Sequence, residues 1–172
     1  MGKSNKIQTE SKTKKRSASL YLRELEPSRQ DIDAYSKVAH GSGIHKYVSF
    51  LEANSHEEAE KRINDSIKNR YETMYGLFKH NRLIGVFVVH DGTFDGVKAA
   101  EVHYFIAEKF QRKGYCIKGI KLLSELLLDT YDFFNFTIRK ENLPSICVQE
   151  KLGSVPQGCT KRYNYYRLEI AA

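Results

Sequence analysis

The sequence lacks the long apolar segment that a membrane span requires. No apolar run approaches the roughly 18 residues of a spanning helix. The first residues contain no apolar core of a secretory signal peptide, and Lys6 holds the place where a myristoylation motif has serine or threonine. We therefore expect a protein without a membrane partner.

Cysteine is also scarce. Cys116, Cys147 and Cys159 form no C-x-x-C pair and are odd in number. This pattern argues against a disulfide framework and against a cysteine metal site. The sequence predicts a reducing, cytoplasmic setting and no bound metal.

Length and charge indicate one folded domain with a basic tail. The chain has 172 residues and 41% hydrophobic residues, which is enough for a real core. Its net charge is +7, of which residues 1–19 carry +5. We expect residues 1–19 to be a disordered tail and residues 20–172 to fold. The tail is either an arm for RNA, ribosome or lipid, or a solvated tail without a partner, and base rates favour the second reading.

The most informative stretch is residues 101–123, which predicts a strand, a basic loop and an amphipathic helix. β-Branched and aromatic residues are frequent in 97–106, and apolar residues recur at helical spacing from Ile117. Gly114, at the start of that helix, lets the backbone approach a ligand, and the first helical amides lack partners. Arg112 and Lys113 add positive charge, so the loop predicts a phosphate-bearing ligand.

Comparison with known phosphate-binding motifs reduces the number of possible ligands. Gly114 and Gly119 have the spacing of a P-loop, but Ile120-Lys121 follow, so the lysine and hydroxyl are misplaced. A dinucleotide fingerprint needs a second glycine where Cys116 stands. The loop instead resembles Q/R-x-x-G-x-G/A, the coenzyme A pyrophosphate loop of the GNAT acetyltransferases, through Gln111, Gly114 and the near match Cys116. A plain basic turn before a helix is the alternative.

A second motif follows the next expected strand, residues 133–138. Here the sequence resembles the N-x-x-S…E-K-x-G signature of the same superfamily, with Asn142, Ser145, Glu150, Lys151 and Gly153. Gly153 also suits a helix C-cap. Two motifs in the right order, separated by a helix and a strand, are far more specific than either alone.

The remaining pattern agrees with that family. We predict a strand at 20–25, helices at 28–39 and 55–70, and a hairpin of 74–79 and 82–89 around His80-Asn81. Asp91-Gly92 and Asp95-Gly96 are turn signals before the strand 97–106. The resemblance implies an α/β fold: a twisted, mostly antiparallel mixed sheet flanked by helices and splayed at a wedge for acetyl-coenzyme A. Residues 46–48 and 55–59 resemble the RimJ/RimL type, which acetylates protein N-terminal amines.

The resemblance also implies which residues hold the cofactor. Backbone groups of Phe105 and Ile106 would bind pantetheine and the thioester carbonyl. Asn142 would bind pantetheine, and Ser145 would contact the cofactor. The pyrophosphate would lie on the loop residues Gln111, Arg112, Lys113, Gly114, Tyr115 and Cys116.

Two strand residues are candidates for acid–base chemistry. The superfamily often places a glutamate on this strand, so Glu101 is the candidate general base, and His103 shares its face by strand alternation. The alternatives are a solvent-facing charge for Glu101 and a packed polar residue for His103. The tyrosine acid expected seven residues after Asn142 is replaced by Gln149. Either the thiolate leaves unprotonated, or a tyrosine such as Tyr163, Tyr165 or Tyr166 reaches in.

The resemblance therefore predicts an acetyl-coenzyme A-dependent N-acetyltransferase. The near-neutral core offers no obvious acidic site for polycations, which favours a peptide N-terminus or a small amine as acceptor. A non-catalytic acyl-coenzyme A-binding protein, or an RNA- or ribosome-associated protein using the basic tail, is the alternative. Monomer and homodimer are both compatible with the sequence.

Overall fold

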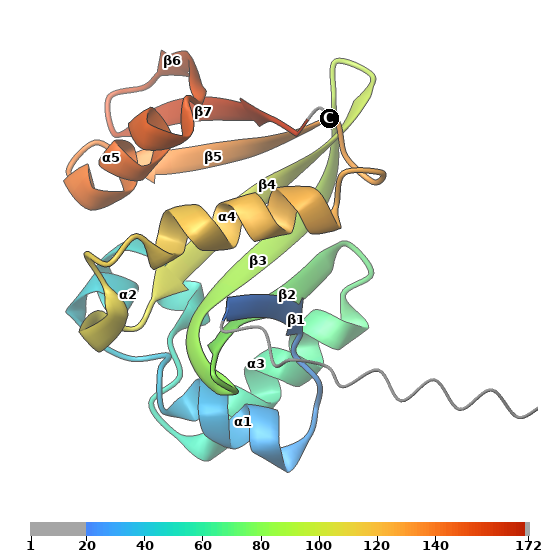
Figure 1. Cartoon of the computed structure of the whole chain (residues 1–172), viewed down its shortest axis with the longest axis vertical. Coiled ribbons are helices and arrows are strands. Elements are labelled where there is room, and N and C mark those ends of the chain that lie inside the picture. Colours follow the sequence, from blue (N-terminus) through green and yellow to red (C-terminus); the bar gives the residue numbers. More distant parts are fainter. Residues whose placement is uncertain (1–19, 171–172) are drawn as a thin grey trace, which may run out of the picture.

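A seven-stranded mixed sheet forms the centre of the computed structural model, which describes residues 20–170 (Figure 1). The strand order is β1-β2-β3-β4-β5-β7-β6. Neighbours pair antiparallel except β4 and β5, which are parallel, so the expected fold class is confirmed. The strands are β1 Leu20–Glu24, β2 Glu72–Lys79, β3 Arg82–Phe94, β4 Val97–Ile106, β5 Phe133–Arg139, β6 Val155–Cys159 and β7 Tyr163–Glu169.

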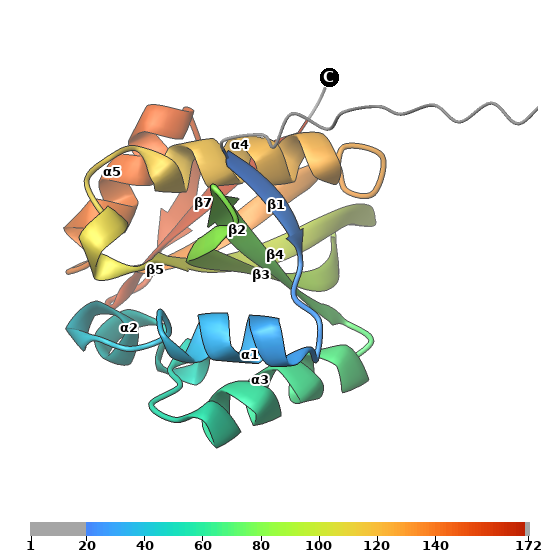
Figure 2. The ribbon, with the colours of Figure 1, turned by 60° about the horizontal axis from the view of Figure 1, so that its bottom comes forward.

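Helices cover both faces of the sheet (Figure 2). One face carries α1, α2 and α3, and the opposite face carries α4 and α5. The expected basic tail, residues 1–19, lies outside the described residues. The helices are α1 Arg29–Ser36, α2 Ser42–Tyr47, α3 His56–Lys68, α4 Tyr115–Leu126 and α5 Leu143–Leu152, with short 3₁₀ turns at Ser49–Leu51 and Glu108–Phe110. No helix in this part of the chain is long and apolar enough to cross a membrane.

Each sheet face has its own apolar core. Ile32, Ile63 and Val88 belong to the core under α1 and α3. Leu123 and Phe87 belong to the core under α4. At Gly119 the helix approaches so closely that a Cβ atom would lie 2.4 Å from Cζ of Phe87. Glycine therefore lets α4 lie directly on β3, which fixes the start of α4 beside the end of β4.

Strands β4 and β5 are paired over a short distance only. In the described chain their register joins Ala99–Glu101 to Phe133–Asn135. Beyond this point β4 stays with β3, while β5 stays paired with β7 along its whole length. The two strands therefore separate toward Ile106 and Arg139, and Figure 1 shows the resulting divergence of the sheet. This is the splay that the sequence resemblance implied.

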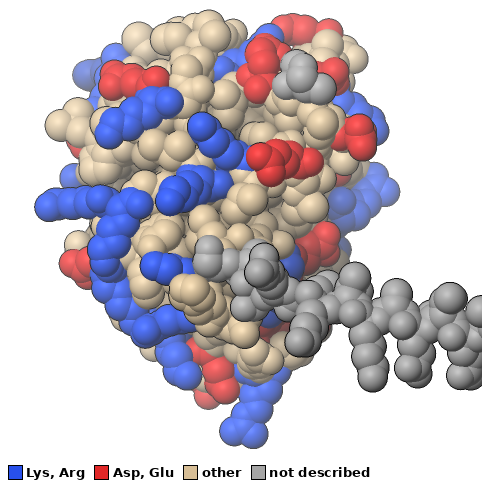
Figure 3. All heavy atoms as spheres, in the orientation of Figure 1, with Lys and Arg blue, Asp and Glu red and all other residues tan. Residues whose placement is uncertain are grey.

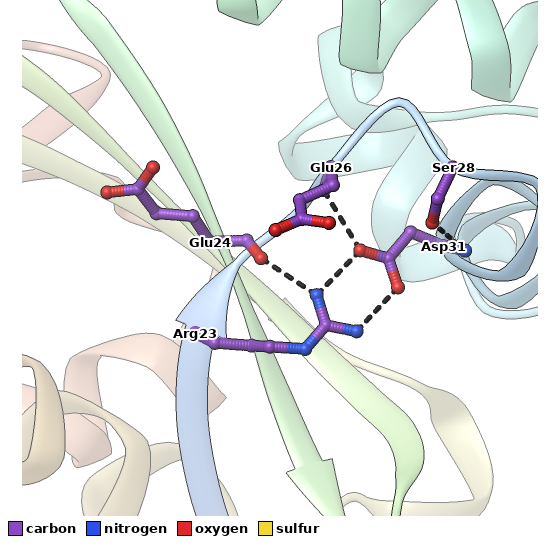
Figure 4. A network of polar contacts seen from close by, with 5 residues as sticks. All are labelled: Arg23, Glu24, Glu26, Ser28 and Asp31. Carbon is purple, nitrogen blue, oxygen red and sulfur yellow. Dashed lines mark hydrogen bonds and ion pairs between the residues drawn. The ribbon is translucent and has the colours of Figure 1, made fainter. Parts of the chain in front are cut away.

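A bidentate ion pair ties α1 to the first strand (Figure 4). Both terminal guanidinium nitrogens of Arg23 donate to the Asp31 carboxylate at 2.6 Å, and the Glu26 amide donates to it at 2.9 Å. The Asp31 amide donates to Ser28 Oγ, which caps α1. Burial raises the pKa of Asp31, but the hydrogen bonds from Arg23 and Glu26 outweigh it, so the pKa is lowered overall.

Most predicted elements are confirmed, and two expectations are wrong. His80-Asn81 and Asp95-Gly96 form turns with positive φ at both positions, as two-residue hairpins require. Gly92, however, lies inside β3 opposite Ala99, because β3 and β4 pair as one long hairpin. The predicted helix 28–39 ends early, and the separate helix α2 follows it.

Candidate active site

A cavity of about 850 Å³ lies where β4 and β5 separate. Its walls come from the ends of β4 and β5, from α2 with the following 3₁₀ turn, from the loop before α4, and from α5. Tyr47 Oη donates to the Glu141 carbonyl at 3.2 Å, which joins α2 to the loop before α5 across the opening. This volume lies within the range of about 300–1,000 Å³ that is typical of small-molecule and cofactor sites.

The loop before α4 has the geometry of a phosphate site. Arg112 and Gly114 both have left-handed backbone, with φ of 59° and 74°. Alternation of this conformation with ordinary residues turns successive amides toward one side, where an anion can bind. A Cβ on Gly114 would meet no atom within 4 Å, so the approach to these amides is open. Gln111 Nε2 donates to the Ile106 carbonyl at 2.9 Å and anchors the loop to β4.

Positive side chains surround this loop. Lys79 donates a hydrogen bond to the Tyr115 hydroxyl, which lowers the pKa of Tyr115. Lys118 also lies over the Tyr115 ring. Figure 3 shows lysine and arginine side chains predominating on the left side of this face, at the level of the loop before α4. The residues present therefore fit the pyrophosphate of coenzyme A.

Glu101 and His103 share one face of β4 with Phe105, as strand alternation predicted, and the structure shows that this is the α1–α3 face. Burial raises the pKa of Glu101, and hydrogen bonds from the side chain and backbone of Thr137 offset part of that rise. Burial, with a smaller contribution from His90, lowers the pKa of His103 to about 4. At neutral pH His103 is thus an uncharged imidazole, and Glu101 is a stronger base than an ordinary glutamate.

A network of side-chain contacts extends from His103 toward α3. The His103 ring lies 5.1 Å from Phe50 and 5.3 Å from His90, both edge to face. His90 Nε2 is 3.6 Å from Glu72 Oε2, and Arg62 Nη1 is 2.7 Å from the other oxygen of that carboxylate. These contacts fix the orientation of the rings at the α2 end of the cavity.

The first turn of α5 forms the opposite wall. Asn142 Oδ1 accepts from the Ser145 amide at 3.4 Å, so Asn142 caps the helix. Gly153 ends the helix with φ of 74°, as the C-cap reading predicted. Gln149 is fully buried and donates from Nε2 to the Tyr104 hydroxyl at 3.3 Å.

The structure brings most of the predicted site residues together, while their roles remain predictions. Glu101 and Lys113 do not line the cavity. Glu101 lies beside Thr137, which does, and Lys113 Nζ donates to the Lys109 carbonyl. The predicted residues in the lining are His103, Phe105, Ile106, Gln111, Arg112, Gly114, Tyr115, Cys116, Asn142 and Ser145.

Sequence reasoning missed two parts of the wall. Tyr47 was indicated only as part of the RimJ/RimL-like stretch 46–48, and Phe50 belongs to a segment with no clear periodicity, so neither was predicted to line the site. Tyr104 lies on the opposite face of β4 from the predicted residues Glu101, His103 and Phe105. The signal for Tyr104 was its place between His103 and Phe105 on a strand expected to border the cofactor.

Comparisons with known proteins agree with this geometry. The family model described as the acetyltransferase (GNAT) domain matches residues 19–155. No curated protein sequence gave a significant match.

Three solved structures illustrate the shared fold. The ribosomal L7/L12 α-N-protein acetyltransferase RimL in complex with coenzyme A has 21% identity and a TM-score of 0.76, covering 89% of this chain and 95% of that one. A spermidine N-acetyltransferase chimera that includes the Vibrio cholerae enzyme has 18% identity and a TM-score of 0.69, covering 89% and 96%. The aminoglycoside acetyltransferase AAC(6')-Ib with coenzyme A has 17% identity and a TM-score of 0.73, covering 88% and 95%.

The family model covers most of the chain, and the structural likeness covers 89% of it. The splayed strands and the loop at Gly114 supply the corresponding geometry. The chain belongs to the GNAT family of acetyltransferases.

Proposed function

We propose that this acetyltransferase moves the acetyl group of acetyl-coenzyme A to the α-amine of a peptide, or to a small amine that is not a polycation. The charge of the cavity carries the proposal. Among the described residues that line it, none is aspartate or glutamate, whereas the lining contains Lys46, Arg112, Arg139 and Lys151.

This charge distinguishes between the acceptors of the structural neighbours. Their names give a ribosomal protein N-terminus, spermidine and an aminoglycoside. Polycations are bound by carboxylates, and like charges in a confined site oppose binding. A peptide α-amine brings one positive charge and can bring acidic side chains that suit Lys46 and Arg139. The peptide acceptor therefore fits this cavity best.

The cofactor groups are assigned to the chain's own residues. The amides of residues 112–116 hold the pyrophosphate at the start of α4. Backbone groups of Phe105 and Ile106 border the cavity where pantetheine enters between the strands. Bound there, acetyl-coenzyme A supplies the activated acetyl group.

Glu101 serves as the general base in this proposal. Its raised pKa brings it closer to the range in which a base is effective at neutral pH. Thr137 connects it to the cavity, so a water beside Thr137 can pass the proton on. His103 lines the cavity but is a weak base, since burial lowers its pKa to about 4. We assign His103 to orienting the acceptor.

An acceptor panel tests the function. Thiol release from acetyl-coenzyme A is measured with a short acidic peptide that has a free α-amine, its lysine-containing counterpart, spermidine and an aminoglycoside. We expect the highest kcat/KM for the acidic peptide. A preference for spermidine or the aminoglycoside by tenfold or more would overturn the proposal.

Charge reversal provides the matched control. Lys46→Glu places a carboxylate in the lining and is expected to lower kcat/KM for the acidic peptide up to about fivefold, since exposed charge pairs contribute about 1 kcal/mol or less. The same substitution should raise kcat/KM for the lysine-containing peptide by a similar factor. Lys61→Glu makes the same change in net charge on the exposed side of α3, outside the lining, and should alter neither value.

A further inference from the structure

A tyrosine on β4 is held beside the residue that stands in place of the family's acid. Tyr104 lines the cavity from the α4–α5 face of the strand, opposite to His103 and Phe105. Its ring is clamped between Phe87, with centroids 5.9 Å apart, and Phe136, at 6.1 Å. The position of the hydroxyl is therefore fixed by packing before any ligand binds.

The hydrogen bonds around Tyr104 have a defined direction. Ser154 Oγ donates to Gln149 Oε1 at 2.7 Å, so the oxygen of the amide faces Ser154. The Nε2 group of Gln149 then faces Tyr104 and donates to its hydroxyl oxygen at 3.3 Å. Tyr104 accepts this bond, and its own proton remains available for another partner.

Within the described residues, the structure shows no hydrogen bond in which the Tyr104 hydroxyl is the donor. The other neighbours of the hydroxyl are the side chains of Ser145 and Cys116. Burial raises the pKa of Cys116, so it stays a thiol, and a thiol sulfur accepts hydrogen bonds weakly. Burial also raises the pKa of Tyr104, so the phenol remains protonated throughout the physiological range. The site thus presents a fixed, neutral donor at the edge of the cavity.

We propose that the Tyr104 hydroxyl donates a hydrogen bond to the sulfur of coenzyme A as it leaves, with Gln149 and Ser154 as positioning residues. This rests on the proposed acetyl transfer. When the amine nitrogen bonds to the acetyl carbon, the carbon–sulfur bond breaks and its electron pair stays on sulfur. The two protons of the substrate ammonium leave through the base to water. Tyr104 keeps its proton, and the thiolate is protonated in solution after release.

Of the two alternatives that the sequence left open, this proposal keeps the thiolate that leaves unprotonated and does not use Tyr163, Tyr165 or Tyr166. Tyr166 is buried in the core between β5 and α4, and Tyr165 does not line the cavity. Tyr163 does line it, but no hydrogen bond within the described residues ties its hydroxyl to α5. Only for Tyr104 does the structure show both packing and a hydrogen bond to Gln149.

A binding measurement tests the role apart from turnover. The ionisation of the thiol of bound coenzyme A is followed by ultraviolet absorbance of the thiolate as the pH is raised. A hydrogen bond to the charged form favours it, so the thiol bound to wild type should ionise about one pH unit lower than the thiol bound to Tyr104→Phe. Tyr166→Phe removes a phenolic oxygen from the same core and should behave as wild type. Desulfo-coenzyme A should bind equally to all three proteins.

Kinetics supply the second readout. Tyr104→Phe should lower kcat roughly 10–100-fold with little change in KM for acetyl-coenzyme A, as expected for loss of one hydrogen bond to a charged group. Gln149→Leu should give a smaller loss of the same kind. Equal thiol ionisation in wild type and Tyr104→Phe would overturn the inference, even if the variant is less stable. Failure of wild type to bind coenzyme A would instead refute the proposed function.

Discussion

Gly114 allows the predicted phosphate-binding role of its loop to be tested with a matched control. Gly114 has φ of 74°, and Gly96, in the turn between β3 and β4, has φ of 78°. A Cβ would meet no atom within 4 Å at either position. The turn at Gly96 lies at the opposite end of β4 from the loop and does not line the cavity. Substitutions at the two glycines therefore share a backbone penalty and differ in their effect on the site.

The magnitudes follow from this geometry. A left-handed conformation costs a residue with Cβ roughly 1–2 kcal/mol, so Gly114→Glu and Gly96→Glu should lose similar stability, about 2–8 °C in Tm. Gly114→Glu also places a charge beside the bound pyrophosphate. One unit charge about 6 Å from another, at an effective dielectric of about 20, costs on the order of 2–3 kcal/mol. The affinity for coenzyme A should fall about a hundredfold.

Calorimetric titration with coenzyme A and thermal melts of both variants test whether this loop binds the pyrophosphate. Gly114→Ala should weaken binding less than Gly114→Glu, because it adds bulk without charge. The difference between them should shrink as salt rises. If Gly114→Glu melts like Gly96→Glu and still binds coenzyme A as tightly as wild type, the loop is not the phosphate site.

Two further predictions concern ionisable groups. Glu101→Gln should lower kcat/KM by about 10²–10⁴-fold. In wild type, kcat/KM should fall as the pH drops through the raised pKa of Glu101, and the variant should lack this ionisation. His103→Gln should lower kcat/KM less than Glu101→Gln does. A Glu101→Gln enzyme within a few-fold of wild type across a pH–rate profile would remove Glu101 from the mechanism. Asp31→Asn should destabilise the fold by about 2–3 kcal/mol at pH 7, because it breaks the ion pair with Arg23. Since the pKa of Asp31 is lowered on folding, this stabilisation is present above about pH 4 and is lost as pH falls through the folded pKa. Urea unfolding of both proteins from pH 7 to pH 3 should show the gap closing, and a constant gap would contradict the assignment.

Local patterns were sufficient for much of the fold. The strand 97–106 was predicted with its observed bounds, and the Ser55 capping pattern was confirmed by a 3.1 Å bond from the Glu58 amide. Gly153 has the left-handed conformation that its predicted C-cap role implied. In each case the determining interaction lies within a few residues along the chain, which is why the sequence alone could reveal it.

The failures depended on distant contacts. Asp91-Gly92 has the composition of a turn, but pairing of Gly92 with Ala99 keeps the strand extended. Helix α2 is too short to show a period, and its place is fixed by the contact of Tyr47 with the loop before α5. The importance of Tyr104 depends on Gln149 and Ser154, which are far from it in sequence. Tertiary packing brings these three residues together, and the spacing of residues in the sequence does not reveal it.

The brief pairing of β4 with β5 has a consequence for cooperativity. Between β4 and β5, only three residue pairs join the C-terminal elements β5, α5, β6 and β7 to the rest of the sheet. Amide protons of β5 should therefore exchange with solvent through partial opening events that leave β2 and β3 closed. A ligand seated between β4 and β5 contacts both units, so its binding energy suppresses this opening directly. Cofactor occupancy would then link the opening of β5 more closely to the unfolding of the rest of the sheet.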